Sequence, residues 1–316
     1  MKEKSRFQDK KVVIVMALIV MFLWGSAVPV TKLSFAELNM GQSESYARIL
    51  FAGIRFFVAS FMVFAYLLIK GRKAPELRLT GLKKKDWRLL LLIGLLRITL
   101  CYFFYYISLA YISGVKGAVL TSSSTFVTVL IAPLFVKEDK FNRGKFFALI
   151  LGFSGIIVAN IDKGFDLNFT WLGEGFMLIS GIFTALVETL IKPKGKGIAA
   201  PLINWGQLLF GSIPLLLIGY IGLEHRLEWT ATAIVLLVYS SIISAVSFIL
   251  WYELLKVNDA GELAIYRLFF PIFGVILSAL LIPGENLTLY IAFGLIMVVL
   301  GIIVLNTMGS KKNRAE

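Results

Sequence analysis

Long apolar runs separated by short polar connections dominate this chain, and we count ten of them. A helix needs about 20 residues to cross the hydrocarbon core of a bilayer, and these runs have roughly that length. Backbone groups in lipid must form their hydrogen bonds within the protein, so the sequence predicts an all-α polytopic membrane protein. The predicted transmembrane helices are residues 12–35, 46–69, 87–111, 114–136, 144–161, 171–191, 198–222, 229–255, 260–282 and 287–307.

The composition leaves little room for a soluble domain, because 58% of the residues are hydrophobic and the mean hydropathy is +0.84. The first apolar run is longer than the core of a signal peptide and lacks a clear small-x-small cleavage pattern. We therefore expect this run to remain in the protein as its first membrane helix.

A repeat relates the two halves of the chain. Residues 102–160 align with residues 248–306 at a constant shift of 146 without a gap, and about 13 of the 59 pairs are identical. Five predicted helices fall in each half, so the second half crosses the membrane in the opposite direction. The sequence thus predicts two inverted five-helix repeats, residues 11–161 and 171–307. This arrangement is typical of secondary transporters, whose substrate site lies between the halves.

Positive charge is unevenly divided between the two sides of the predicted bundle. With the amino terminus in the cytoplasm, 24 of the 32 Lys and Arg residues fall on the cytoplasmic side and five on the other. This positive-inside pattern places both termini in the cytoplasm. The net charge of +13 is therefore a topology signal and a source of headgroup contacts, and it does not indicate nucleic-acid binding.

The chain resembles the EamA-type branch of the drug/metabolite transporter superfamily over almost its whole length. The shared features are a Trp-Gly pair and a lysine in the first helix, an Arg-Phe pair in the second, and an acidic residue before a glycine-rich last helix in each half. In this sequence they are Trp24-Gly25, Lys32, Arg55-Phe56, Glu138-Asp139, Gly284-Glu285, and glycines 152, 155, 294 and 301. The resemblance implies that predicted helices 1, 3, 4, 6, 8 and 9 surround a central cavity while helices 5 and 10 lie outside. It also favours export as the direction of transport.

Three arginines lie deep within predicted helices, where an ionisable side chain costs about 2.5–3.5 kcal/mol on insertion scales. In the helix arrangement that the resemblance implies, Arg97 and Arg267 face the cavity, whereas Arg55 braces the packing of the second helix. An arginine fork in a low-dielectric cavity suits a carboxylate or phosphate, so Arg97 and Arg267 are candidate substrate-binding residues. Alternatively, each arginine pairs with a carboxylate or with helix-end carbonyls and never meets substrate.

Glu188 is the acidic candidate, one turn from the cytoplasmic end of the sixth predicted helix. A carboxylate in an apolar cavity favours its protonated form, so Glu188 is a candidate for proton coupling or for neutralising a cationic substrate group. The alternative is a surface pair with Lys192, four residues further along the same helix.

Neutral side chains supply the remaining candidates. Aromatic rings can bind an amine by cation–π contact or an apolar group by packing. Hydroxyl groups can donate to a solute, although they also allow close helix packing. Packing against lipid or neighbouring helices is the alternative for each of these residues. The substrate-binding candidates of this kind are Trp24, Tyr102, Tyr106, Tyr266, Ser122 and Thr125.

The chain lacks the residues that several other functional classes require. No Gly-rich Walker loop is present, which argues against ATP as the energy source. His225 is alone in a predicted loop, and Cys101 is the single cysteine, so we expect no metal centre and no intrachain disulfide. No serine has a plausible histidine partner in the membrane. We accordingly expect no catalytic residues, no cofactor and no enzymatic activity.

The sequence therefore predicts a secondary active transporter in the plasma membrane, operating by alternating access and driven by protons or by exchange. The expected substrate is a small polar metabolite, an amino acid or a similar zwitterion or anion. A multidrug or organic-cation exporter is the main alternative, favoured by Glu188 and the aromatic residues and opposed by the deep arginines. A channel is a weaker alternative. We expect the protein to be a monomer or a homodimer.

Overall fold

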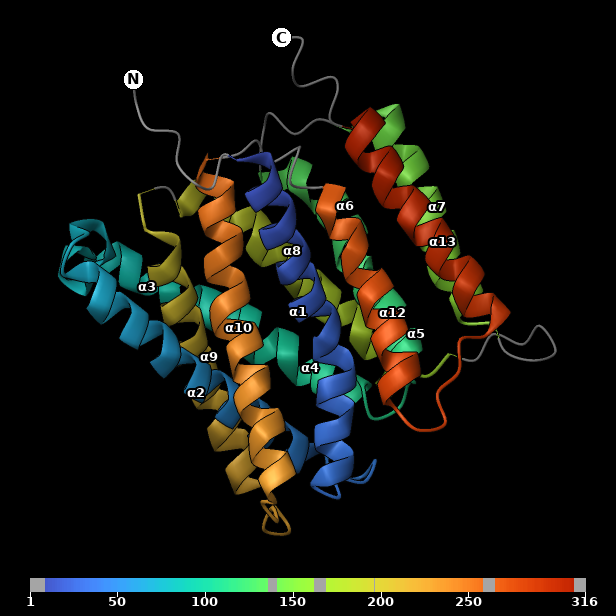
Figure 1. The fold of residues 1–316 in the computed structure, drawn as a ribbon, viewed down its shortest axis with the longest axis horizontal. Helices are drawn as coiled ribbons and strands as arrows, with labels where there is room; N and C mark the ends of the chain where they lie inside the picture. Colours follow the sequence, from blue (N-terminus) through green and yellow to red (C-terminus); the bar gives the residue numbers. More distant parts are fainter. Residues whose placement is uncertain (1–8, 136–140, 162–168, 196, 258–264, 310–316) are drawn as a thin grey trace.

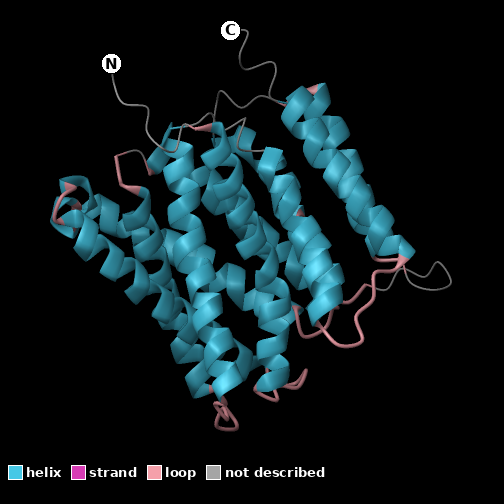
Figure 2. Cartoon of the chain, viewed as in Figure 1, coloured by secondary structure: helices cyan, strands magenta, loops and turns pink. Residues whose placement is uncertain are grey.

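The computed structural model describes residues 9–135, 141–161, 169–195, 197–257 and 265–309. Helices account for almost all of these residues, as Figure 2 shows, and only short connections join them. Eight helical stretches are long and apolar enough to cross a membrane, and residues 266–281 form a shorter apolar helix. The predicted class, an all-α polytopic membrane protein, is confirmed.

Each of the ten predicted segments coincides with helix in the described residues. In order, the helices are α1 (Lys10–Glu37), α2 (Ser45–Gly71), η2 (Pro75–Leu77), η3 (Leu79–Gly81), α3 (Lys84–Gly94), η4 (Leu95–Leu100), α4 (Cys101–Ser108), α5 (Gly114–Thr121), α6 (Ser123–Phe135), α7 (Arg143–Ala159), η5 (Trp171–Gly175), α8 (Phe176–Lys194), α9 (Ala200–Ile221), α10 (Ala231–Val257), η6 (Ile265–Leu268), α12 (Phe269–Leu281), α13 (Leu289–Val304) and η7 (Leu305–Gly309). The acidic pair Glu138-Asp139 lies outside the described residues.

Two predicted helices have interruptions that their apolar pattern does not reveal. The third, predicted over 87–111, ends at Ser108, and residues 95–100 form a π-helix between α3 and α4. The fourth, predicted as one helix over 114–136, is divided at Ser122 into α5 and α6. A π-helical turn inside an α-helix is often found at a functional site.

Helix contacts occur in matching pairs between the two halves of the chain. Helix α2 packs against α9 and α7 packs against α13, which join equivalent helices of the two halves. The contacts of α1 with α12 and α10 are matched by those of α8 with α6 and α4, and the α2–α10 contact is matched by the α9–α3 contact. The two halves thus pack on one another as copies of one arrangement, with α1 and α8 in equivalent places.

Close approach of glycine backbones holds α7 and α13 together at one edge of the bundle (Figure 1). A Cβ atom at Gly155 would lie 2.7 Å from the carbonyl oxygen of Gly294, and one at Gly294 would lie 2.6 Å from that of Gly155. These glycines therefore act as packing positions, and the pair of helices lies outside the centre of the bundle.

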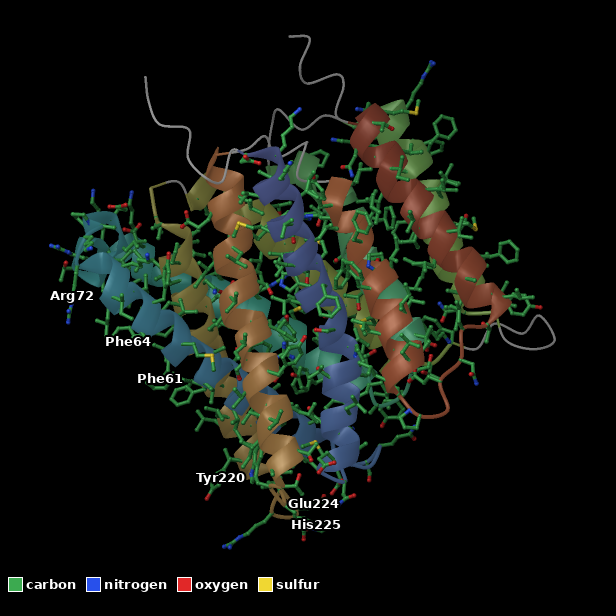
Figure 3. The ribbon with its side chains drawn as sticks, in the orientation of Figure 1. Phe61, Phe64, Arg72, Tyr220, Glu224 and His225 are labelled. Atoms are coloured by element: carbon green, nitrogen blue, oxygen red, sulfur yellow. The ribbon has the colours of Figure 1, made fainter. Side chains whose placement is uncertain are left out.

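The described chain begins and ends at the same end of the bundle. In Figure 1 the first turn of α1 and the last turn of α13 lie at the top, and we name this the upper end. The lower end contains the end of α1 and the connection between α9 and α10, where Figure 3 places Glu224 and His225. Phe61 projects from the outer face of α2 (Figure 3) with 55% of its side chain exposed, as expected for a surface that meets lipid.

Candidate functional site

Aromatic rings from α1 and α10 meet in the interior of the bundle. The ring of Trp24 lies 5.4 Å from that of Phe248 and 5.8 Å from that of Trp251, measured between centroids. Phe248 and Trp251 are three residues apart, so they lie on the same face of α10. Trp24 is half-buried and Trp251 is buried. These three rings form an apolar floor between the two halves of the chain.

Two arginines stack on this floor from opposite halves of the chain. The guanidinium carbon of Arg97 lies 5.9 Å from the ring centroid of Phe248, and that of Arg267 lies 5.7 Å from the ring of Trp251. Arg97 belongs to the π-helical η4, and Arg267 belongs to the short η6 before α12. Cation–π contacts of this kind are worth about 0.5–2 kcal/mol.

Among the described side chains, the carboxylate of Glu188 makes only long polar contacts. Its Oε2 lies 3.6 Å from Nη1 of Arg267 and 3.4 Å from the hydroxyl of Thr128. That hydroxyl donates a shorter hydrogen bond of 2.8 Å to the carbonyl oxygen of Ser124. About a third of each charged side chain is exposed, 35% for Arg267 and 32% for Glu188. Lys192, the alternative partner of Glu188, has a side chain outside the described part of the structure.

We name these residues the central cluster. Its members come from α1, η4, α6, α8, α10 and η6, which correspond to the six helices predicted to line the cavity. Tyr266, another predicted site residue, packs beside it against the apolar group that contains Trp251. The central cluster comprises Trp24, Arg97, Thr128, Glu188, Phe248, Trp251 and Arg267.

Arg55 occupies a different and fully enclosed environment. Only 2% of Arg55 is exposed, and its guanidinium donates to the carbonyl oxygen of Ser240 at 3.1 Å, to Tyr106 at 2.9 Å, to Ser244 at 3.2 Å and to Thr31 at 3.4 Å. Among the described residues, no carboxylate lies within ion-pairing distance. Neutral acceptors from α1, α4 and α10 therefore satisfy this arginine, which ties α2 to three other helices.

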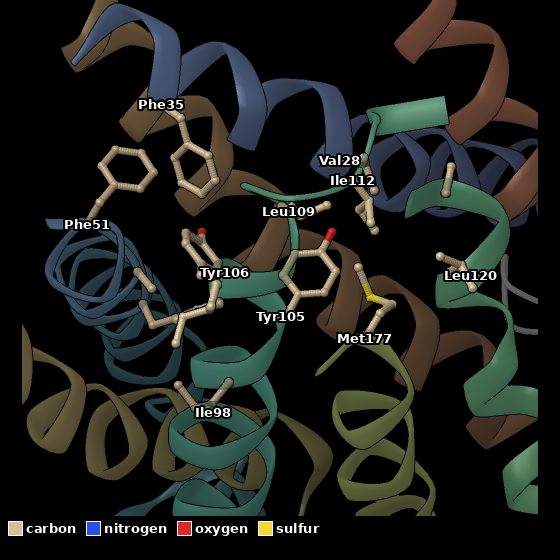
Figure 4. Packing of buried hydrophobic residues seen from close by; sticks show 14 of the residues in the cluster. Val28, Phe35, Phe51, Ile98, Tyr105, Tyr106, Leu109, Ile112, Leu120 and Met177 are labelled. Carbon is tan, nitrogen blue, oxygen red and sulfur yellow. The ribbon is translucent and has the colours of Figure 1, made fainter. Parts of the chain in front are cut away.

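The two predicted tyrosines lie beside Arg55 rather than in the central cluster. Tyr106 is fully buried, and its ring lies near those of Phe35 and Phe51 (Figure 4), at centroid distances of 5.7 and 6.4 Å. Tyr102 is half-buried and packs against Phe56 at a centroid distance of 4.4 Å.

The two predicted hydroxyl residues lie where α5 gives way to α6. Ser122 is 2% exposed, and its Oγ has no hydrogen-bond partner among the described residues. Thr125 is half-buried in the first turn of α6. Neither residue makes a described contact with the arginines of the central cluster.

Three members of the central cluster are not among the site residues that the sequence predicts: Thr128, Phe248 and Trp251. A signal for Phe248 exists in the repeat, because the shift of 146 residues places it opposite Tyr102, which was selected. Thr128 has a weaker signal, since it lies one helical turn beyond Ser124 in a run of hydroxyl residues.

The chemistry of the central cluster suits an anion with an apolar or amino-bearing body. Two guanidinium groups offer forked donors to a carboxylate, the rings offer an apolar or cation-binding face, and Glu188 offers one acceptor. Among the described residues, no group of three or more His, Cys, Asp or Glu side chains is arranged to hold a metal ion.

These features define a polytopic helical membrane protein with a polar and aromatic centre, as solute transporters have. The chain belongs to the EamA-like transporter family, whose model matches residues 11–161 and 171–307. It is 28% identical over 305 residues to the protein named "Uncharacterized transporter YvbV" of Bacillus subtilis (strain 168), with 95% of this chain and 94% of that protein covered. An Archaeoglobus fulgidus protein named "Uncharacterized transporter" is 23% identical, with 90% and 93% covered.

A solved crystal structure has the same fold. It superposes on this structure with a TM-score of 0.63, covering 94% of this chain and 98% of that chain at 15% identity. The match to the family model confirms the predicted family, and the protein is a multi-pass membrane transporter.

Proposed function

We propose that this transporter carries a small metabolite with a carboxylate group, most favourably a zwitterion such as an amino acid, by alternating access between two inverted repeats. One observation carries the proposal. Arg97 from the first half and Arg267 from the second stack on the same apolar floor, on the rings of Phe248 and Trp251 respectively. A carboxylate bound there contacts both halves, so its binding responds to their relative position.

Glu188 supports both the zwitterion and the coupling in this proposal. Its carboxylate lies beside Arg267, so an ammonium group and a carboxylate of one small solute find complementary partners in the central cluster. The loose pairing of Glu188 allows a substrate carboxylate to take its place on Arg267. Glu188, which then loses its pairing with Arg267, is the proposed proton-exchanging group.

The proposed orientation places the upper end in the cytoplasm of a plasma-membrane protein. The connection between α2 and α3, residues 72–83, lies at that end (Figure 1) and contains four of the Lys and Arg residues that produce the positive-inside pattern. Export is the proposed direction, because the family resemblance favours it. Lipophilic cations are the second candidate substrates, since Trp24, Trp251 and Glu188 can bind a cation, but the two stacked arginines oppose them.

Flux into proteoliposomes tests this proposal. Purified protein is reconstituted, and the uptake of labelled amino acids, carboxylates and organic cations is measured with and without an imposed proton gradient. We expect saturable flux of at least one zwitterion or carboxylate that protein-free vesicles lack. Flux restricted to organic cations, or no flux of any zwitterion or carboxylate, would contradict the proposed substrate class. Flux without saturation would indicate a channel.

A further inference from the structure

The carboxylate of Glu285 connects the two halves of the chain near the lower end. This residue precedes α13, and its two oxygens accept hydrogen bonds from the backbone amides of Gly114 at 2.6 Å and Val115 at 2.8 Å. These amides form the first turn of α5, where a negative charge is favourably placed. The second half of the chain thus caps a helix of the first.

Lys32, near the end of α1, completes this connection. Its ammonium group donates to the carbonyl oxygen of Ile112 at 2.6 Å and to Oε1 of Glu285 at 3.2 Å. One lysine therefore joins α1, the connection before α5 and the connection before α13. We name Lys32, Glu285 and the first turn of α5 the end lock.

A second ion pair holds the same turn of α5 from another side. Lys116 pairs with Glu174 in η5, and Glu174 also accepts from the backbone amide of Thr170 at 2.8 Å and from its hydroxyl at 2.9 Å. The side chain of Glu174 is 3% exposed. A carboxylate from the connection before α13 and a carboxylate from η5 therefore fix the first turn of α5.

The other end of α5 has the features of a hinge. The helix contains eight residues and ends at Ser122, whose backbone amide donates to the carbonyl oxygen of Val119 rather than continuing the α-helical pattern. The hydroxyls of Ser122 and Ser123 are buried, and neither has a hydrogen-bond partner among the described residues. Buried hydroxyls without partners are costly, so a second arrangement of this joint that satisfies them is favourable.

We propose that α5 is a mobile gate at the lower end, held shut by the end lock and turning about Ser122 and Ser123. This inference rests on the proposed alternating access, and it assigns Glu285 and Lys32 as positioning residues that set which side the central cluster faces. In the present structure the gate is closed. About a third of the Arg267 and Glu188 side chains is exposed in this state. Opening requires Glu285 to release the amides of Gly114 and Val115.

Thiol labelling of a buried position in α5 tests the gate without any substrate. Cys101 is the single cysteine, so Cys101→Ser provides the background into which Val115→Cys is introduced. Val115 is 1% exposed in the locked structure, and its labelling by a polar maleimide in detergent reports opening. We expect Glu285→Gln to raise the labelling rate about tenfold or more. Lys32→Met should raise it less, because the hydrogen bonds from the backbone amides of Gly114 and Val115 to Glu285 remain.

Two controls separate gate opening from other effects. Glu224→Gln removes a carboxylate from the lower end outside the end lock and should leave the rate unchanged (Figure 3). Leu90→Cys is fully buried in α3, and its labelling should stay slow in the Glu285→Gln background. Equal rates at Val115→Cys with and without Glu285→Gln would overturn the proposal. Parallel increases at Leu90→Cys and Val115→Cys would also overturn it, because they would indicate general unfolding.

The labelling experiment tests the end lock and the flux measurement tests the proposed substrate, so either claim can be contradicted without the other. Faster labelling of Val115→Cys in Glu285→Gln, together with no zwitterion or carboxylate flux, would support the end lock and contradict the proposed substrate. Flux with no change in labelling would remove the end lock and leave the proposed function.

Discussion

Arg55 and Arg267 are both arginines inside membrane helices, yet their surroundings are opposite. Arg55 is 2% exposed and donates to four neutral acceptors at 2.9–3.4 Å. Arg267 is about a third exposed, and its described partners are a ring at 5.7 Å and a carboxylate oxygen at 3.6 Å. Hydrogen bonds within the protein satisfy the guanidinium of Arg55, whereas the guanidinium of Arg267 has only long contacts with described residues.

This difference indicates how a transporter can separate structural from functional charge. A buried cation is expensive in lipid, and Arg55 offsets that cost through hydrogen bonds that fix the relative positions of α1, α2, α4 and α10. A binding cation must instead exchange its partners, which requires weak interactions in the unliganded state. The distances around Glu188 and Arg267 have that character.

The largest expected effect follows from replacing Arg55. Arg55→Gln removes the guanidinium donor from the hydroxyls of Tyr106 and Ser244 in a closed interior, and each unsatisfied buried group costs about 1–3 kcal/mol. We expect a large fall in thermal stability in detergent, with loss of monodisperse protein in size-exclusion chromatography. Arg72→Gln, at an exposed position (Figure 3), serves as the control. A stable, monodisperse Arg55→Gln protein would remove the structural half of the comparison.

Replacing Arg267 should have the converse effect. Arg267→Gln removes a charge-assisted interaction worth about 1.5–3 kcal/mol, so substrate flux should fall about 10- to 100-fold while the melting temperature changes little. Its described partners are a ring face and a distant carboxylate, which explains the small expected loss of stability. Flux in proteoliposomes and thermal unfolding are compared on the same preparation. A drop in stability like that of Arg55→Gln would assign Arg267 to the fold.

Arg97 tests whether the second stacked arginine belongs with Arg267. We expect Arg97→Gln to reduce transport more than membrane expression, because its guanidinium stacks on Phe248 at the proposed carboxylate site. Transport and expression are measured in the same cells or vesicles. Equal losses of both would show that Arg97 is a structural residue like Arg55.

Replacing Glu188 tests whether transport is coupled to protons through this carboxylate. Glu188→Gln keeps the shape of the side chain but cannot exchange a proton, so we expect flux to lose its dependence on the proton gradient while exchange of substrate across the membrane persists. Glu76→Gln, at an exposed carboxylate in η2, is the matched control. Unchanged gradient dependence in Glu188→Gln would assign proton coupling to another group or remove it.

The smallest effect is expected for Thr128. Its hydroxyl donates principally to Ser124 and only approaches Glu188, so Thr128→Val removes little from the ion pair. We expect less than about a fivefold change in substrate affinity, which corresponds to under about 1 kcal/mol. A loss as large as that of Arg267→Gln would show that Thr128 contacts substrate directly.

The sequence predicts the helices well and their interruptions poorly. Lipid enforces long apolar runs, so segments such as α1 and α9 are evident from composition alone. The π-helix at residues 95–100 and the break at Ser122 are set by packing between helices, which an apolar pattern does not record. The deep arginines are visible because lipid makes charge expensive, yet only the contacts of Arg55 and Arg267 reveal how differently they are satisfied.

The most direct test of the central claim is ligand-induced thermal stabilisation of the wild-type protein and of Arg267→Gln, screened across amino acids and carboxylates. We expect a carboxylate-bearing metabolite to raise the melting temperature of the wild type and of Arg72→Gln, but not that of Arg267→Gln. Equal stabilisation of all three proteins by the same metabolite would contradict it, because substrate would then bind without the loosely paired arginine.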